Sequence, residues 1–239
     1  MSEGMYVALS GSIARQSQLD IVSNNLANIN STGYRAQRAV FAEALNEAGS
    51  PTPSVRTSEV ALDMTPGPLT QTSNPLDLGI SGDGWFRVAL PTGGEAITRG
   101  GSFVLSPEGT VTTQQGYDLL DVAGNPVQVS EHDGRVTVEE DGTLWTEYGG
   151  EQTLSIVVPQ DPTQLQPIGG GLVATPAENL MPSESPSVSQ GYLEQSNASP
   201  MRGMTEMITL QRYFETMQNL IQSHHDLDKR AIAAVGSVR

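Results

Sequence analysis

The sequence contains few of the side chains that most often act as catalytic bases or nucleophiles. It contains three histidines, His132, His224 and His225, and no cysteine. The lack of cysteine excludes disulfides, thiolate metal sites and cysteine nucleophiles. A serine hydrolase of the common type would place its nucleophile in a G-x-S-x-G motif, which the sequence does not contain. We therefore expect a protein that is not an enzyme, with no catalytic residues.

Three short motifs suggest metal or phosphate binding, and each has a simpler interpretation. His224 and Asp228 are four residues apart, which puts two ligands on one face of a helix, but we expect His224 to be a seam or surface residue. The acidic run Glu139–Gly142 lacks the alternating carboxylates of an EF-hand loop and is predicted to be a solvated hairpin tip. The run Gly169–Gly171 is followed by no lysine and opens no helix, unlike a phosphate loop. We expect no metal and no cofactor.

The acidic residues are concentrated in the middle of the chain. The formal charge at pH 7 is −15, and Lys229 is the only lysine. Residues 1–75 carry 6 acids and 4 bases (−2), residues 76–196 carry 17 acids and 3 bases (−14), and residues 197–239 carry 4 acids and 5 bases (+1). This balance excludes a basic nucleic-acid surface, and the absence of a long apolar run excludes membrane insertion through a helix.

Both ends of the sequence have the periodicity of helices. From Glu3 to Asn28 there is no proline, and apolar residues that include Leu9, Ile13 and Leu26 recur at helical spacing. At the other end Pro200 precedes a proline-free stretch to Arg239. Its apolar residues follow a 3-4-3-4 heptad spacing, namely Met207, Leu210, Phe214, Met217 and Ile221. A helix with such a narrow stripe needs a partner helix.

Two arrangements would supply that partner. The terminal helices could form an antiparallel hairpin within one chain, or both stripes could face other subunits. The pattern alone does not decide between them.

The middle of the chain has the texture of an all-β sandwich or barrel. Short apolar runs recur every 8–12 residues and are separated by turn residues such as those of Asp133-Gly134 and Asp141-Gly142. Strands are predicted over 85–90, 102–105, 110–112, 117–120, 127–129, 135–138, 143–145 and 154–158. Trp85 and Trp145 are predicted to anchor its core. Residues 44–75 and 159–186 are rich in proline, glycine and serine and are predicted to be irregular connecting chain.

The segment that ends the first helix resembles the signature of the flagellar axial proteins, the family of rod, hook and hook-associated proteins. In that family an N-N-L-A-N segment is followed by T-G-[FY], and the corresponding residues here are Asn24, Asn25, Leu26, Ala27, Asn28, Thr32, Gly33 and Tyr34. Asparagine side chains suit the exposed backbone groups of a helix end, and Gly33 suits a chain reversal.

Three further blocks are similar to family motifs. They are Leu76–Phe86, Arg99–Phe103 with Gly109–Leu120, and Gly191–Asn197 followed by Gln211–Glu215. The short chain favours a rod protein over a hook protein. Within the rod group the chain is most similar to proximal-rod members, with distal-rod members as the alternative.

This resemblance implies an α+β fold in which the terminal helices pair as a coiled coil, disordered in some free monomers, around an inserted all-β domain. The division is 1–34 and 197–239 for inner-tube assembly, 35–75 and 174–196 for an extended neck, and 76–173 for the outer domain. The expected assembly interface is Leu9, Ile13, Leu26, Met207, Leu210, Phe214, Met217 and Ile221.

The implied function is that of a structural component of the flagellar basal-body rod, a periplasm-spanning axle for motility. Implied partners are other copies of the chain, other rod proteins and the flagellar type III export apparatus, with periplasmic ring proteins as further candidates. Because Glu3 precedes any cation, we expect no cleaved signal peptide. The alternatives are a β-rich extracytoplasmic binding or adhesin module flanked by coiled-coil helices, a hook-type axial protein, and a peptidoglycan hydrolase.

Overall fold

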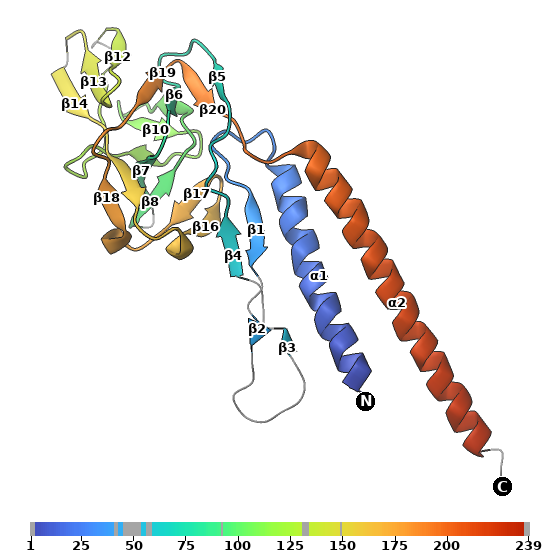
Figure 1. Cartoon of the computed structure of the whole chain (residues 1–239). Helices are drawn as coiled ribbons and strands as arrows, with labels where there is room; N and C mark the ends of the chain where they lie inside the picture. Colours follow the sequence, from blue (N-terminus) through green and yellow to red (C-terminus); the bar gives the residue numbers. More distant parts are fainter. Residues whose placement is uncertain are drawn as a thin grey trace. The chain divides into compact units, whose positions relative to one another are not determined.

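The computed structural model describes residues 3–40, 43–44, 54–55, 59–91, 93–130, 134–148 and 150–236. The α+β chain divides into two compact units (Figure 1). The helical unit comprises residues 1–27, 37–60 and 199–239, so it combines both ends of the sequence. The β-rich unit comprises residues 28–36 and 61–198.

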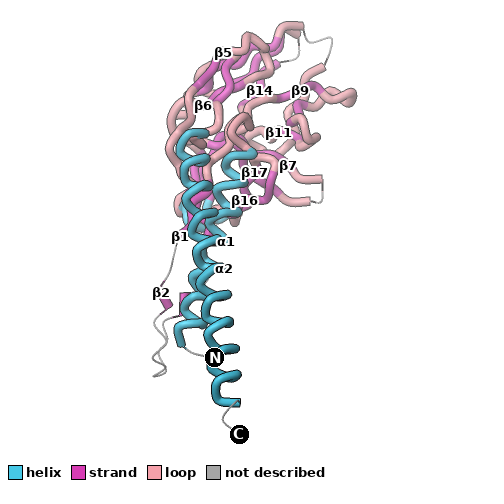
Figure 2. The backbone as a smooth tube through the Cα atoms, turned by 90° about the vertical axis from the view of Figure 1, so that its right-hand side faces the viewer, coloured by secondary structure: helices cyan, strands magenta, loops and turns pink. Residues whose placement is uncertain are grey.

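Two long helices, α1 (Glu3–Ala27) and α2 (Pro200–Gly236), dominate the helical unit and lie side by side in both views (Figures 1 and 2). Both were predicted from their proline-free apolar periodicity, and α2 begins at Pro200 as expected. The helices run antiparallel: a Cβ built on Gly11 would lie 3.7 Å from Met217 Cε, and one on Gly203 would lie 4.0 Å from Leu26 Cδ1. Among the described residues, no helix combines the length and apolarity that a membrane span requires.

The main sheet of the β-rich unit has nine strands and branches at its centre. Along one path the order is β16-β17-β8-β7-β11-β10-β9, and β15 pairs with both β7 and β18. The strands are β7 (Trp85–Ala89), β8 (Glu95–Thr98), β9 (Phe103–Leu105), β10 (Val111–Thr113), β11 (Asp118–Leu119), β15 (Ile156–Pro159), β16 (Gln166–Gly169), β17 (Leu172–Ala174) and β18 (Leu180–Pro182). The branch arises because β15 pairs with the first half of β7 and β11 with its second half.

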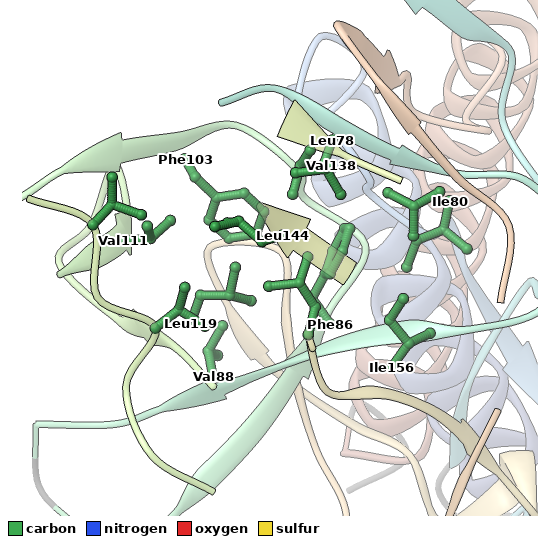
Figure 3. Packing of buried hydrophobic residues seen from close by; sticks show 14 of the residues in the cluster. Leu78, Ile80, Phe86, Val88, Phe103, Val111, Leu119, Val138, Leu144 and Ile156 are labelled. Carbon is green, nitrogen blue, oxygen red and sulfur yellow. The ribbon is translucent and has the colours of Figure 1, made fainter. Parts of the chain in front are cut away.

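The central strands of this sheet are buried on both faces, which explains why β7 and β8 are apolar at successive positions. Phe86 belongs to the larger cluster, where its ring meets the Phe103 ring edge to face at 5.3 Å (Figure 3). Its neighbour Trp85 belongs to a second cluster with Ile97 and Val157. Successive residues of a strand point to opposite faces of the sheet, so the neighbours Trp85 and Phe86 contribute to different clusters.

A three-stranded sheet, β12 (Val136–Val138), β13 (Thr143–Thr146) and β14 (Gly150–Thr153), adds Val138 and Leu144 to the larger cluster. As predicted, Glu139–Asp141 form an exposed tip, at the turn from β12 to β13. The prediction that Trp145 anchors the core is wrong, because Trp145 alternates with the buried Leu144 and therefore points outward.

Short strand pairs complete the structure. β1 (Gln37–Val40) pairs with β4 (Glu59–Leu62), β2 (Glu43–Ala44) with β3 (Ser54–Val55), β5 (Leu69–Gln71) with β20 (Tyr192–Glu194), and β6 (Leu78–Ile80) with β19 (Val188–Gln190). Two short 3-10 helices, η1 (Pro162–Gln164) and η2 (Ala177–Asn179), lie between strands of the main sheet.

Three segments differ from the sequence predictions. The stretch 44–75, predicted to be irregular connecting chain, contains β3, β4 and β5. The stretch 159–186, predicted to be irregular, contains β16, β17 and β18, and the run Gly169–Gly171 is the positive-φ turn of the β16–β17 hairpin. The stretch 127–129, predicted to be a strand, forms only an isolated bridge at Gln128, although Val127 and Val129 are buried. Asp133 lies outside the described residues.

Candidate functional site

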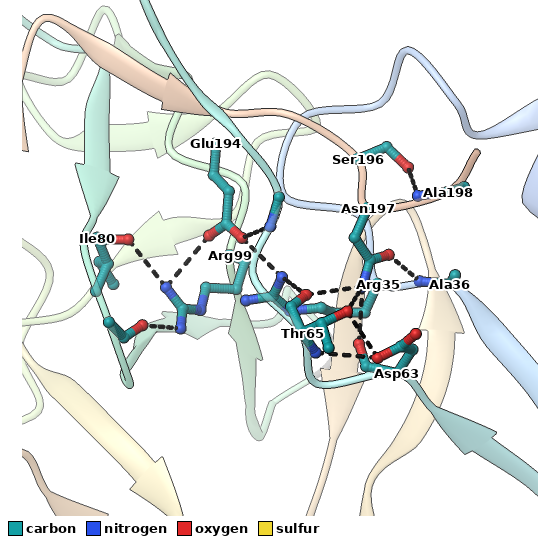
Figure 4. A network of polar contacts seen from close by, with 12 residues as sticks. Arg35, Ala36, Asp63, Thr65, Ile80, Arg99, Glu194, Ser196, Asn197 and Ala198 are labelled. Carbon is teal, nitrogen blue, oxygen red and sulfur yellow. Dashed lines mark hydrogen bonds and ion pairs between the residues drawn. The ribbon is translucent and has the colours of Figure 1, made fainter. Parts of the chain in front are cut away.

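The β-rich unit contains a buried ionic junction (Figure 4). The Glu194 carboxylate accepts a bond from Arg35 Nη1 at 2.7 Å on one oxygen and from Arg99 Nη1 at 3.2 Å on the other. The three side chains are 1–4% exposed. Arg35 follows the first helix in sequence, Arg99 follows β8, and Glu194 ends β20, so the junction joins distant parts of the chain. We call these three residues the ionic junction.

Two arginines face one carboxylate, so the junction carries a net positive charge that backbone and aromatic groups must offset. Arg35 donates to the Thr65 carbonyl, and Arg99 donates to the carbonyls of Ile80 and Gly82. Both guanidinium groups also lie over the Trp85 ring, 5.9 and 5.8 Å from its centroid, where cation–π attraction contributes. Burial lowers the pKa of Arg99 to about 10, with Glu194 opposing that shift, so Arg99 stays charged at neutral pH.

Asn197 forms a second set of contacts beside the junction (Figure 4). Its amide donates to the carbonyls of Asp63 and Thr65 at 3.0 and 2.8 Å, and its side-chain oxygen accepts from the Ala36 backbone at 2.7 Å. Thr65 thus receives bonds from both Arg35 and Asn197. These side-chain bonds add to the backbone bonds that already join the segments around residues 35, 65 and 195, such as those from the Asp63 amide to the Ala36 carbonyl and from the Gln195 amide to the Pro68 carbonyl.

The predicted signature residues comprise the last turn of α1, which ends at Ala27, and the turn that leads from it to the junction. Gly33 has φ +67°, and a Cβ there would lie 2.1 Å from the Arg99 carbonyl carbon, so only glycine fits. The Gly33 amide donates to the Glu194 carbonyl at 2.7 Å. Thr32 precedes Gly33 within this turn. The Asn28 carbonyl, directly after α1, accepts a hydrogen bond from the Ser31 amide.

Asn25 has a specific role inside the helical unit. Its amide donates to the Gln37 carbonyl at 2.7 Å, and its oxygen accepts from the Gln37 amide at 2.8 Å. The side chain therefore bonds β1 as a neighbouring strand would. Asn24 adds a weaker bond to the Gln37 side chain at 3.3 Å. This accounts for two adjacent asparagines at the end of a helix.

Tyr34 makes the stability of the β-rich unit sensitive to alkaline pH. Burial raises the pKa of Tyr34 to about 12, so between pH 10 and 12 the unfolded chain loses this proton before the folded chain does. The contribution of the protonated Tyr34 to the free energy of unfolding is fully present below pH 10 and is lost as the pH rises through 12. In Tyr34→Phe we expect the melting temperature to fall less steeply across that interval. Tyr148→Phe, at an exposed position, should retain the wild-type slope; equal slopes in all three proteins would contradict the assignment.

The predicted interface residues occupy different environments. Leu210 is 5% exposed, whereas Met207, Phe214, Met217 and Leu26 are half-buried. Ile13 is 60% exposed. The side chains of Leu9 and Ile221 lie outside the described residues, as do His132 and the side chains of His224, His225 and Asp228. Whether these residues contact other subunits stays a prediction.

A second apolar stripe runs along α2 away from α1. Met201 is 79% exposed, and Met204 and Ile208 are each 53% exposed. Their 3-4 spacing places them on one face, and Ile208 is about 200° around the helix from the buried Leu210. We call these three residues the outer stripe. Monomeric proteins seldom leave such rows of large apolar side chains in water.

The ionic junction and Asn197 were not among the predicted site residues. Arg99 and Glu194 lie in two separate motifs that carried the family resemblance, and Arg35 directly follows the last signature residue, Tyr34. The strongest available signal was the opposite charges of these residues. Among the described residues, no group of three histidine or acidic side chains gathers in a way that could hold a metal.

Comparison with known families covers both units. A profile described as "Flagella basal body rod protein" matches residues 5–35, "Flagellar hook protein FlgE/F/G D1 domain" matches 79–166, and "Flagellar basal body rod FlgEFG protein C-terminal" matches 189–234. The junction residues Arg35 and Glu194 lie in the first and third matches, and Arg99 lies in the second. The three matches therefore correspond to the parts that the junction joins.

Full-length relatives agree with the profiles. The chain is 32% identical to the flagellar basal-body rod protein FlgF of Caulobacter vibrioides, over 100% of both chains, and 31% identical to that of Salmonella typhimurium, over 97% of both. It is 30% identical to the flagellar basal-body rod protein FlgG of Agrobacterium fabrum, over 92% of this chain and 95% of that protein. The sequence, from its first helix to its last, thus belongs to the flagellar basal-body rod protein family.

Proposed function

We propose that this protein is a subunit of the periplasm-spanning rod of the flagellar basal body. It assembles with its own copies and other rod proteins through its terminal helices, and the resulting helical axle transmits torque for motility. The flagellar type III apparatus exports it without cleavage, and periplasmic ring proteins are further contacts of the finished rod. This role is structural and uses no cofactor.

The observation that carries the proposal is the presence of two apolar faces on α2. One face, around Leu210, packs against α1, while the outer stripe is exposed. A contact between the outer stripe and a different surface of the next copy is heterologous, and repetition of such a contact builds an open helical filament. The stripe around Leu210 has heptad spacing, which supports coiled-coil packing within that filament.

The charge distribution also supports assembly through the terminal helices, with the β-rich part of the chain facing outward. Residues 197–239 have a net charge of +1, whereas residues 76–196 have −14. Helices that pack against copies of themselves must avoid a large charge of one sign, while an acidic outer part keeps the assembly soluble. The adhesin alternative explains neither the full-length relatives nor the signature turn at Gly33.

Deletion of residues 201–239 tests the role of α2. We expect the truncated protein to keep a folded β-rich unit, because both buried clusters of that unit lie outside the deletion. The truncated protein should be missing from purified basal bodies and should fail to restore motility to cells that lack the native protein. Restored motility would remove the terminal-helix proposal.

A finer test addresses the outer stripe alone. Ile208→Asp places a charge in the stripe, and Thr209→Asp places the same charge on the neighbouring exposed position. We expect Ile208→Asp to reduce incorporation into basal bodies at least tenfold while the monomer retains its helical content. Equal incorporation of the two variants would contradict the role of the stripe.

A further inference from the structure

The three-stranded sheet β12–β14 has an outer face centred on an exposed tryptophan. Trp145 of β13 is paired with Thr137 of β12 on one side and Glu151 of β14 on the other. It is 41% exposed, and Tyr148 at the following turn is 76% exposed. Since the opposite face of this sheet supplies Leu144 to the core, the orientation of Trp145 is fixed by the fold.

Acidic residues are frequent in this sheet and its turns, and one of them, Glu151, is the cross-strand partner of Trp145. Residues 134–153 contain five acids and one base, Arg135, giving −4. The acids are Glu139, Glu140, Asp141, Glu147 and Glu151, and all five are exposed. Within the described part of the chain, none of them pairs with a cation, whereas the ion pairs present involve Glu194 and Glu95.

This combination is complementary to one kind of ligand. An arginine guanidinium stacks on an indole face and at the same time donates paired hydrogen bonds to a carboxylate. Tryptophan is also among the residues that dominate binding energy when a partner covers it. We propose that the face formed by Trp145, Tyr148, Glu147 and Glu151 is a docking surface for an arginine-bearing basic segment of another protein.

The charge of the chain favours another protein over a second copy. Two copies that approach through their β-rich units bring together residues 76–196 of each, which carry −14 apiece, and these repel at moderate ionic strength. The docking face lies wholly in the β-rich unit, so its use does not depend on the outer stripe. Failure of helical assembly and failure of docking are therefore separable.

Binding of a short basic peptide to the full chain tests the surface. The probe is an acetylated and amidated hexa-arginine peptide, with hexalysine as the comparison. Trp145 itself reports binding, because the other tryptophan, Trp85, is 2% exposed and contributes a constant background. We expect hexa-arginine to shift the tryptophan emission, to bind more tightly than hexalysine, and to weaken as salt is raised.

Variants separate the specific surface from the overall charge. Trp145→Ala should weaken hexa-arginine binding by roughly tenfold, measured by calorimetry, whereas Trp145→Phe should retain most of the affinity. Glu147→Gln with Glu151→Gln should weaken binding and flatten its salt dependence. The matched control Glu178→Gln with Glu184→Gln removes the same charge from other exposed positions of the unit and should bind as the wild type does.

Three outcomes would overturn the proposal. If the control variant and the Glu147/Glu151 variant lost the same amount of affinity for hexa-arginine, binding would depend only on the overall charge of the unit. If Trp145→Ala bound hexa-arginine with wild-type affinity, or if hexalysine and hexa-arginine bound equally well, the proposal that an arginine stacks on Trp145 would be contradicted. Sedimentation showing that Trp145→Ala abolishes self-association but leaves peptide binding unchanged would assign the face to a second copy.

Discussion

Replacing Glu194 by alanine is expected to lower the free energy of unfolding of the β-rich unit by about 3–5 kcal/mol, because the change leaves two buried arginines without their shared anion. The Gly67 amide, which donates to the Glu194 carboxylate at 2.8 Å, loses its acceptor as well. The loss should appear as a lower denaturation midpoint in urea, followed by tryptophan fluorescence, since Trp85 lies against both arginines.

Glu95→Ala is the matched control, because it removes a carboxylate of similar geometry at the surface. Glu95 bonds Arg87 at 2.8 Å, close to the Arg35–Glu194 distance, but its side chain is 41% exposed. An exposed pair of this kind contributes at most about 1 kcal/mol. If both variants unfolded at the same midpoint, burial of the junction would have no energetic consequence.

Leu210→Asp is expected to disrupt the helical unit and leave the β-rich unit intact. Leu210 is the most buried of the described side chains of α2, and a carboxylate there would lose its hydration against α1. The cost of removing a buried leucine is about 2–5 kcal/mol even without the charge. Circular dichroism should show that the helices of the variant melt at a lower temperature than those of the wild type. Tryptophan fluorescence, which reports on the β-rich unit, should show an unchanged melting temperature. The variant should be absent from purified basal bodies.

Thr209→Asp again serves as the control, since it introduces the same charge on the same turn of α2 at an exposed position. We expect it to keep both the helical melt and incorporation into basal bodies. Efficient incorporation of Leu210→Asp would show that the contact between α1 and α2 is not needed for assembly, and would restrict the interface to the outer stripe.

The sequence predicted those elements whose signal is local. The two helices follow from long proline-free periodicity, and the turn from β12 to β13 follows from Asp141-Gly142. There Gly142 has φ +85° and the Asp141 side chain accepts from the Thr143 amide. In each of these cases the residues that define the element also stabilise it.

Elements that depend on tertiary pairing were missed. β8 is only four residues long, and glycines flank it at positions 93–94 and 100–101, so it has the appearance of a loop. It forms because β7 on one side and β17 on the other supply its hydrogen bonds. The residues 166–174 were overlooked for the same reason, since Gly169–Gly171 suggested irregular chain.

The site was predictable only in part. Its motifs were found because they are compact blocks in the sequence, but spacing carries no information about which blocks meet. Glu194 lies 159 residues from Arg35 and 95 from Arg99. The wrong prediction that Trp145 is buried has a related origin. A large aromatic residue suggests burial, but the neighbouring Leu144 occupies the core face of the strand, so Trp145 points to the other face.

The separation of Arg35 from Glu194 along the chain also governs how the β-rich unit folds. Closing a loop of 159 residues costs about 4.5 kcal/mol of chain entropy from its length alone, before any junction contact is made. The junction therefore forms late, after the sheet has shortened the effective loop, and folding of this unit should be slow. During synthesis, about four fifths of the chain must be made before Glu194 is available. Synthesis and folding are thus coupled by the position of one carboxylate near the end of the insert.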